Sequence, residues 1–154
     1  MADLSYGSTV DEWNRVEKII STPRLELHHI GAQDLITLYE EPDNLAIYEG
    51  QPYSNPYRQL IDDKGPLAWR VPQVKENPRL NQWFVRWIVL KASSEIIGST
   101  SFHGAPDPDG MIEIGLGIQE GFRNMGYAKE SLLGMWRWAT EDPLVKILRY
   151  TVSV

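Results

Sequence analysis

Cysteine is absent from the 154-residue sequence. Without thiols the chain has no disulfide framework, no thiolate nucleophile and no zinc–thiolate site. Histidine is scarce, because its three instances are His28, His29 and His103, and none of them has metal-ligand spacing around it. Adjacent residues on a strand point to opposite faces, so His28 and His29 cannot chelate one ion together. We therefore expect no metal site.

Long apolar runs are missing as well. The longest extend over about four residues, as at 87–90, whereas a membrane-spanning helix needs roughly 20. Residues 1–10 lack the basic and apolar segments of a secretion signal. These absences predict a cytoplasmic protein with no membrane partner.

Basic residues are outnumbered, with 15 Lys and Arg against 21 Asp and Glu, so the net charge is −6. A negative charge disfavours a nucleic-acid partner, because the phosphate backbone attracts basic surfaces. Large packing groups are plentiful: the chain has six Trp and seven Tyr, and 42% of its residues are hydrophobic. This composition is typical of one globular domain with a core of its own.

The pattern of apolar residues divides the chain into an N-terminal leader, residues 1–22, and one domain, residues 23–154. Helical spacing predicts a short helix at 11–20 in the leader. In the domain, strict alternation at 24–30 predicts a half-exposed first strand. Helical spacing at 32–41, ended by a proline, predicts an amphipathic helix after it.

Residues 42–82 contain six of the ten prolines, which disfavours regular strands. A long segment with little regular structure is often functional. Two compatible interpretations stay open for this segment. It forms helical turns packed by aromatic residues over the sheet edge, or it forms a wall of a substrate pocket.

The second half of the domain has the pattern of a strand meander followed by a strand–helix–strand unit. Strands are expected at 83–90, 96–102, 111–118 and 146–154, with a helix at about 126–140. The expected inner stripe of this helix is Ala128, Leu132, Leu133, Trp136 and Ala139. The two strands that flank it should be parallel. The predicted fold class is therefore α/β or α+β, a mixed sheet with flanking helices.

The strand at 111–118 separates apolar from bare positions. Its two faces consist of Ile112, Ile114, Leu116 and Ile118 on one side, and Met111, Glu113, Gly115 and Gly117 on the other. Two glycines on one face weaken a strand, so they indicate a place where another group approaches the main chain closely. That group would lie beside Glu113.

The loop after this strand leads into the N-terminus of the expected helix. The first N–H groups of a helix have no internal partners and carry partial positive charge, so they can hold a phosphate. Arg123 would add a full charge there, and Gly126 would allow close approach. The alternative is an ordinary strand-to-helix turn with a solvated arginine.

Two other phosphate motifs fit this segment poorly. A P-loop requires Gly-Lys-Ser or Gly-Lys-Thr, and neither occurs in the chain. The glycines at 115, 117 and 121 are spaced one residue too widely for a dinucleotide fingerprint.

Residues 118–128, Ile-Gln-Glu-Gly-Phe-Arg-Asn-Met-Gly-Tyr-Ala, resemble motif A of the GNAT acetyltransferases. The loop of that motif is Arg or Gln, two residues, Gly, any residue, and Gly or Ala, which Arg123, Gly126 and Ala128 match. Asn124 occupies a position where the family often has Gly. The opening Thr-Pro-Arg-Leu-Glu-Leu at 22–27 is similar to the branch that includes the ribosomal-protein N-terminal alanine acetyltransferases.

The resemblance implies a GNAT-like, mostly antiparallel central sheet and an N-acetyltransferase. Acetyl-coenzyme A would donate an acetyl group directly to a primary amine, a protein N-terminus or a small amine, through a tetrahedral intermediate. The coenzyme would lie between the strands at 111–118 and 146–154, with its pyrophosphate on the loop at 123–128. The implied coenzyme-binding residues are Ile114, Gly115, Leu116, Gly117, Ile118, Arg123, Asn124, Met125, Gly126, Tyr127 and Ala128.

Acetyl transfer to an amine needs a base, donors for an oxyanion and an acid or solvent for the leaving thiolate. Glu113 is the first candidate base, because it is the ionisable side chain on the bare face of its strand. The alternative for Glu113 is a carboxylate held by a neighbouring Arg or Tyr. His103 is the second candidate base, with a surface residue as its alternative. Ser99 and Ser101 could orient substrate, and backbone N–H groups at 114–116 could hold the oxyanion.

Members of this family continue beyond the fifth strand, whereas the sequence ends at Val154. Three explanations stay open: a C-terminally truncated chain, a homodimer or partner chain that completes the sheet, and a reduced domain without turnover. We favour truncation, because an open apolar sheet edge promotes aggregation. The general acid would then lie in the missing segment. The alternative function is a non-catalytic coenzyme A-binding or protein-interaction module.

Overall fold

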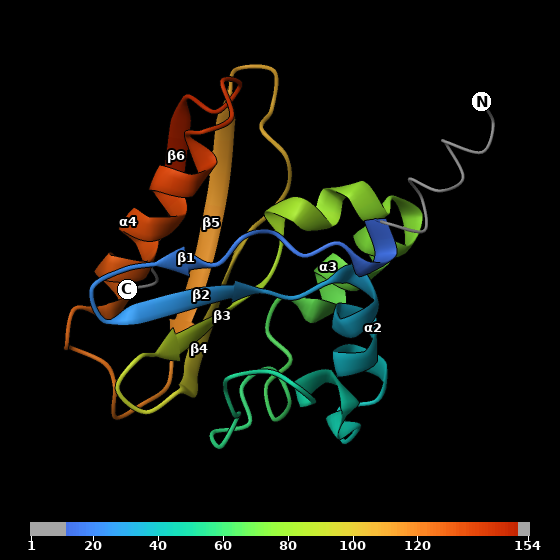
Figure 1. Ribbon diagram of the computed structural model, residues 1–154. Helices are drawn as coiled ribbons and strands as arrows, with labels where there is room; N and C mark the ends of the chain where they lie inside the picture. The colour runs from blue at the N-terminus through green and yellow to red at the C-terminus, as the bar shows by residue number, and fades with distance from the viewer. Residues whose placement is uncertain (1–11, 151–154) are drawn as a thin grey trace.

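The computed structural model describes residues 12–150, which form a six-stranded sheet with helices on both sides (Figure 1). The strands lie in chain order: β1 (Ile20–Ser21), β2 (Leu25–His29), β3 (Arg86–Leu90), β4 (Glu95–Phe102), β5 (Met111–Ile118) and β6 (Ile147–Tyr150). Neighbouring strands are antiparallel except β5 and β6, which are parallel. The expected mixed, mostly antiparallel sheet is confirmed.

Three helices and two 3-10 helices connect the strands in the described chain. They are α2 (Ala32–Glu40), η1 (Leu45–Tyr48), α3 (Leu67–Glu76), η2 (Pro78–Trp83) and α4 (Tyr127–Ala139). Figure 1 shows α4 beside β1 and β5 on one side of the sheet, and α2 with α3 on the other side. No helix within residues 12–150 is long and apolar enough to cross a membrane.

An aromatic cluster fixes α4 to the sheet. Trp138, near the end of α4, has its ring centroid 5.5 Å from that of Trp83 and 6.2 Å from that of Phe102. Met135 and Ala139 of the same helix are buried, Trp138 is partly buried, and Leu133 is exposed. The predicted inner stripe is therefore wrong at Leu133, because the buried face of α4 is centred one residue further on and includes Ser131 and Gly134.

The helix predicted at 11–20 is wrong for most of its length. Among residues 12–20, only 12–14 are helical, and Ile20 already belongs to β1. Val16 and Ile19 are 58% and 52% exposed, so the apolar spacing does not mark a buried stripe. These residues are β-branched, which favours extended backbone.

Other boundaries differ from the predictions for identifiable reasons. The strand expected from residue 83 begins at Arg86, because η2 extends to Trp83. The first strand is expected to be half exposed, but His28 is buried on the face predicted to be exposed. The ring of Tyr53 covers it, with the two ring centroids 4.9 Å apart. Residues 151–154 of the expected last strand lie outside the described residues.

The proline-rich segment at 42–82 contains no regular strand, as predicted, apart from one bridge between Ser54 and Glu95. It includes the ten-residue helix α3 as well as the expected helical turns. The buried Leu67, Val71 and Val74 give α3 an apolar face at helical spacing. This segment therefore packs as a layer of its own on the sheet.

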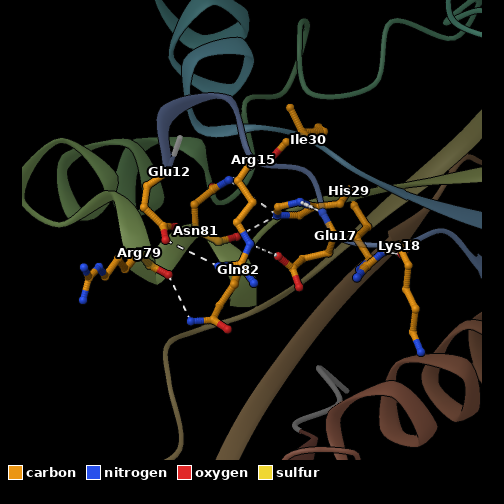
Figure 2. A network of polar contacts seen from close by, with 10 residues as sticks. Glu12, Arg15, Glu17, Lys18, His29, Ile30, Arg79, Asn81 and Gln82 are labelled. Carbon is orange, nitrogen blue, oxygen red and sulfur yellow. Dashed lines mark hydrogen bonds and ion pairs between the residues drawn. The ribbon is translucent and has the colours of Figure 1, made fainter. Parts of the chain in front are cut away.

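His29, at the end of β2, is buried between the N-terminal segment and η2 (Figure 2). Its Nδ1 accepts a hydrogen bond from the Glu17 backbone N–H at 2.9 Å, and its Nε2 lies 2.7 Å from the carbonyl oxygen of Asn81. A carbonyl can only accept, so Nε2 carries the proton and the imidazole is neutral. Burial is the largest cause that lowers the pKa of His29 to about 4, and the charges of Arg86 and Arg15 lower it further.

This histidine makes stability depend on pH. The unfolded chain binds a proton at His29 below about pH 6.5, whereas the folded chain does so only near pH 4. The free energy of unfolding should therefore be highest above pH 6.5 and fall by about 2–3 kcal/mol between pH 6.5 and 4. Urea unfolding across this range should show the fall in the wild type and in His28→Gln, and a much smaller one in His29→Gln. Equal slopes in all three proteins would contradict it.

Candidate functional site

β5 has one apolar face and one nearly bare face, as its alternation predicts. Ile112 and Ile114 are buried in the core, whereas Gly117 is exposed. Pairing with β6 covers residues 111–114, and no described residue continues that ladder alongside 115–118. The second half of β5 therefore has a sheet neighbour, β4, on one side only within residues 12–150.

A pocket of about 420 Å³ lies over this second half of β5. Its strand walls come from residues 115–118 of β5 and 99–101 of β4. The rest of the lining includes Arg123 from the following loop, His103, and Asp63 and Gly65 from the proline-rich segment. The interpretation of the proline-rich segment as a pocket wall is thus consistent with its position.

The pocket brings together only part of the predicted site. Of the predicted residues, Ser99, Ser101, His103, Gly115, Leu116, Gly117, Ile118 and Arg123 line it. Glu113, Ile114 and the loop residues Asn124, Met125, Gly126, Tyr127 and Ala128 do not line it. The side chain of Ile114 points into the core, where β5 pairs with both β4 and β6.

Gly98 of β4 and Gly117 of β5 lie on neighbouring strands, but only Gly98 is required to be glycine by the packing of the fold. A Cβ on Gly98 would lie 2.2 Å from the carbonyl oxygen of Gly117, so close packing of β4 on β5 requires glycine there. A Cβ on Gly117 would meet nothing within 4 Å. The fold therefore does not demand a bare residue at Gly117, and the space is free for a ligand.

The loop before α4 contains left-handed residues at its turning points. Asn124 has φ 64° and Gly126, the N-cap of α4, has φ 84°. Asn is among the residues that adopt this conformation most readily, so Asn124 is compatible with the turn. No side chain at the N-cap accepts a hydrogen bond from the first N–H groups of α4. Arg123 donates from Nε to the carbonyl oxygen of Ile118 at 2.8 Å and fixes the loop to β5.

A clamp from the start of β2 holds this loop, and the sequence analysis missed it. Arg24 donates from Nη1 to the carbonyl oxygen of Met125 and from Nε to Glu130, both at 2.8 Å. Its guanidinium lies 4.3 Å from the centre of the Tyr127 ring. Burial raises the pKa of Glu130, but hydrogen bonds from Thr22 and Arg24 outweigh it and lower the pKa. An acidic residue in the first turn of α4 was the available signal.

His103 and Glu113 form a pair at the other end of the pocket. The Nδ1 of His103 lies 3.1 Å from Oε1 of Glu113, and Nε of Arg149 lies 3.6 Å from Oε2. An ionised carboxylate can only accept, so Nδ1 donates to it, and in the neutral imidazole Nε2 is then an acceptor. That Nε2 lies over Gly115, 3.3 Å from where a Cβ would be. His103 therefore presents a proton acceptor to the pocket, while Glu113 lies behind it.

The site thus offers an elongated ligand three features. The bare face of β5 lies at its centre, Arg123 lies at one end with the N-terminus of α4 beyond the pocket, and the imidazole of His103 lies at the other end. Such an arrangement can bind an anionic tail and remove a proton from a group near His103.

A curated relative matches a limited segment of the chain. The protein named uncharacterized N-acetyltransferase YjdG, from Bacillus subtilis (strain 168), is 42% identical over 57 residues, which are 36% of this chain. The chain spans 34% of the length of that relative.

Solved structures share the fold over most of the chain. A putative ribosomal-protein-serine acetyltransferase from Vibrio cholerae has a TM-score of 0.52 at 16% identity, covering 89% of this chain and 75% of that chain. The RimL ribosomal L7/L12 alpha-N-protein acetyltransferase in complex with coenzyme A also has a TM-score of 0.52 at 16% identity, covering 86% and 73%. A GNAT-family acetyltransferase from Bacillus anthracis has a TM-score of 0.50 at 15% identity, covering 88% and 74%.

The comparison that covers most of the domain is with a family. The model of the acetyltransferase (GNAT) domain matches residues 24–153. This match includes the pocket, the Arg24 clamp and the loop before α4. The chain belongs to the GNAT acetyltransferase domain family.

Proposed function

We propose that this protein is an N-acetyltransferase that moves the acetyl group of acetyl-coenzyme A to a primary amine, a protein N-terminus or a small amine. One observation carries the proposal: a single pocket joins the bare strand at Gly117, the loop at Arg123 and the imidazole of His103. The fold of the RimL structure, which holds coenzyme A, supports the ligand class. Its description as an alpha-N-protein acetyltransferase supports an amine acceptor.

The residues present fit the coenzyme. The open space beside Gly117 accepts a thin chain such as the pantetheine arm along residues 115–118. The uncapped first turn of α4 and Arg123 supply donors and positive charge for the pyrophosphate. When bound, the coenzyme supplies a thioester whose carbonyl carbon is open to attack.

His103 acts as the base in this proposal, with Glu113 as a positioning residue. The Nε2 of His103 takes a proton from the ammonium form of the acceptor, and the nitrogen of the resulting neutral amine then forms a bond to the acetyl carbon. Backbone N–H groups near residues 114–116 stabilise the oxyanion of the tetrahedral intermediate. The nitrogen of the intermediate loses its second proton to solvent, the carbon–sulfur bond breaks as the intermediate collapses, and the thiolate takes a proton from solvent or a general acid. This order reverses the sequence-based preference, because His103 lines the pocket and Glu113 does not.

A partner for the edge strand β6 stays a prediction. Ile147 in β6 is half exposed, and β5 is the one neighbour that β6 has within the described chain. A second copy or another chain would complete the sheet at this edge.

Isothermal titration with acetyl-coenzyme A tests the coenzyme site. The wild type should bind at one site, and Gly117→Val should weaken binding at least tenfold with an unchanged melting temperature, because the new side chain enters the pocket. Gly104→Val is the matched control, since its Cβ also meets nothing within 4 Å but it lies outside the pocket. Equal affinity of Gly117→Val and the wild type would refute the placement. Gly126→Val is a poorer test, because φ 84° also strains a valine.

The catalytic pair is tested by thiol release in the presence of a panel of N-terminal peptides and small amines. His103→Gln should lower kcat by about 10²- to 10⁴-fold while acetyl-coenzyme A still binds. Glu113→Gln should lower kcat less, because the amide oxygen can still accept a hydrogen bond from Nδ1 of His103. An unchanged kcat in His103→Gln would exclude this base. Binding without transfer to any amine would favour the non-catalytic module.

The clamp at Arg24 should govern coenzyme affinity rather than the chemical step. Arg24→Gln removes the donor to Met125 and the partner of Glu130, so KM for acetyl-coenzyme A should rise about tenfold with kcat nearly unchanged. Arg79→Gln, an exposed arginine of η2, is the control. Adding Glu130→Gln to Arg24→Gln should raise KM little further, because the effects of substitutions at two residues in contact are not additive. Additive losses would show that the two residues act separately.

A further inference from the structure

A second hollow continues the pocket toward α3. It is lined by Gly65, Pro66, Trp69, Arg70, Gln73 and His103. Three of these residues, Gly65, Pro66 and His103, also line the first pocket. His103 therefore lies at the junction of the two spaces, with the β5 backbone on one side and α3 on the other.

One face of α3 forms the wall of this hollow. Gln73 follows Trp69 by four residues and Arg70 by three, so it neighbours both of them on the surface of the helix. Trp69 is 73% exposed, whereas Arg70 is only 8% exposed. The helix therefore presents an open indole next to a nearly buried guanidinium.

Arg70 has no carboxylate within ion-pair distance among residues 12–150. Its Nη1 donates to Oε1 of Gln73 at 2.9 Å, and its guanidinium lies 5.5 Å from the centre of the Phe84 ring. Its Nε is buried without a hydrogen-bond partner. Burial lowers the pKa of Arg70. A cation in this position is costly unless an anion approaches it.

We propose that this hollow, lined by Trp69, Arg70 and Gln73, binds an acceptor that carries a carboxylate a few bonds from its amine. The carboxylate accepts from the guanidinium of Arg70, whose planar fork suits two oxygens. The amine then lies at His103, where the two pockets meet. The assignment of the amine end rests on the proposed function. A free amino acid and an N-terminal peptide with an acidic side chain share this chemistry.

Nuclear magnetic resonance titration of the coenzyme A-saturated protein tests the carboxylate site without requiring turnover. The reporter is the indole N–H signal of Trp69, assigned with Trp69→Phe. The small probes are β-alanine and 4-aminobutyrate, each against its carboxamide. The peptide probes are Ser-Glu-Ala and Ser-Gln-Ala, both amidated at the C-terminus.

In at least one pair, the carboxylate should bind the wild type at least tenfold more tightly than its carboxamide. Arg70→Gln should remove this preference, and Arg79→Gln should retain it. Arg70→Lys keeps the charge without the planar fork, so its preference should be intermediate, and this variant decides the matter if Arg70→Gln does not fold. No preference in the wild type, or a full preference in the Arg70 variants, would overturn the inference.

The two proposals fail in different ways. A carboxylate preference without thiol release from any probe would refute acetyl transfer and leave the binding site established. Thiol release with every amine and no carboxylate preference would refute the acidic acceptor alone. The pair that shows the preference, small or peptide, identifies the source of the acceptor.

Discussion

The candidate site depends on the close packing of β4 on β5. Residues 114–118 of β5 pair with β4, and residues 111–114 pair with β6. The pocket lies over residues 115–118, where Gly115 and Gly117 leave the face of the strand bare. Gly98 keeps β4 close enough to β5 for this arrangement.

Contacts between distant parts of the chain then fix the two ends of the pocket. At the loop, Arg24 and Glu130 are 106 residues apart yet make an ion pair at 2.8 Å. At the opposite end, the hairpin register of β4 and β5 brings His103 beside Glu113. In each contact, one side chain faces the pocket or the loop before α4, and its partner lies outside the pocket. The partner restricts the orientation of the side chain that faces the site.

Period-two and helical patterns were sufficient for the local elements. They predicted the bounds and bare face of β5 and the position of α4, because both depend on neighbouring residues. They failed at 11–20, where apolar spacing did not distinguish a helix from an extended β-branched segment. The Arg24 clamp and the His103–Glu113 pair could not be derived this way, because they depend on tertiary register rather than on local spacing.

Two buried arginines show how the same residue type serves different purposes in this acidic chain. Arg86 donates to the carbonyl oxygens of Lys18 and Leu27, and its guanidinium lies over the ring of Trp138. Arg70 has only the neutral amide of Gln73 and an aromatic ring, and it borders an open hollow. A buried charge without such acceptors contributes little to stability. A ligand that fills the hollow excludes water from the surroundings of Arg70. The attraction between the guanidinium and a carboxylate is stronger without water, so Arg70 would prefer a ligand with a carboxylate over one with an amide.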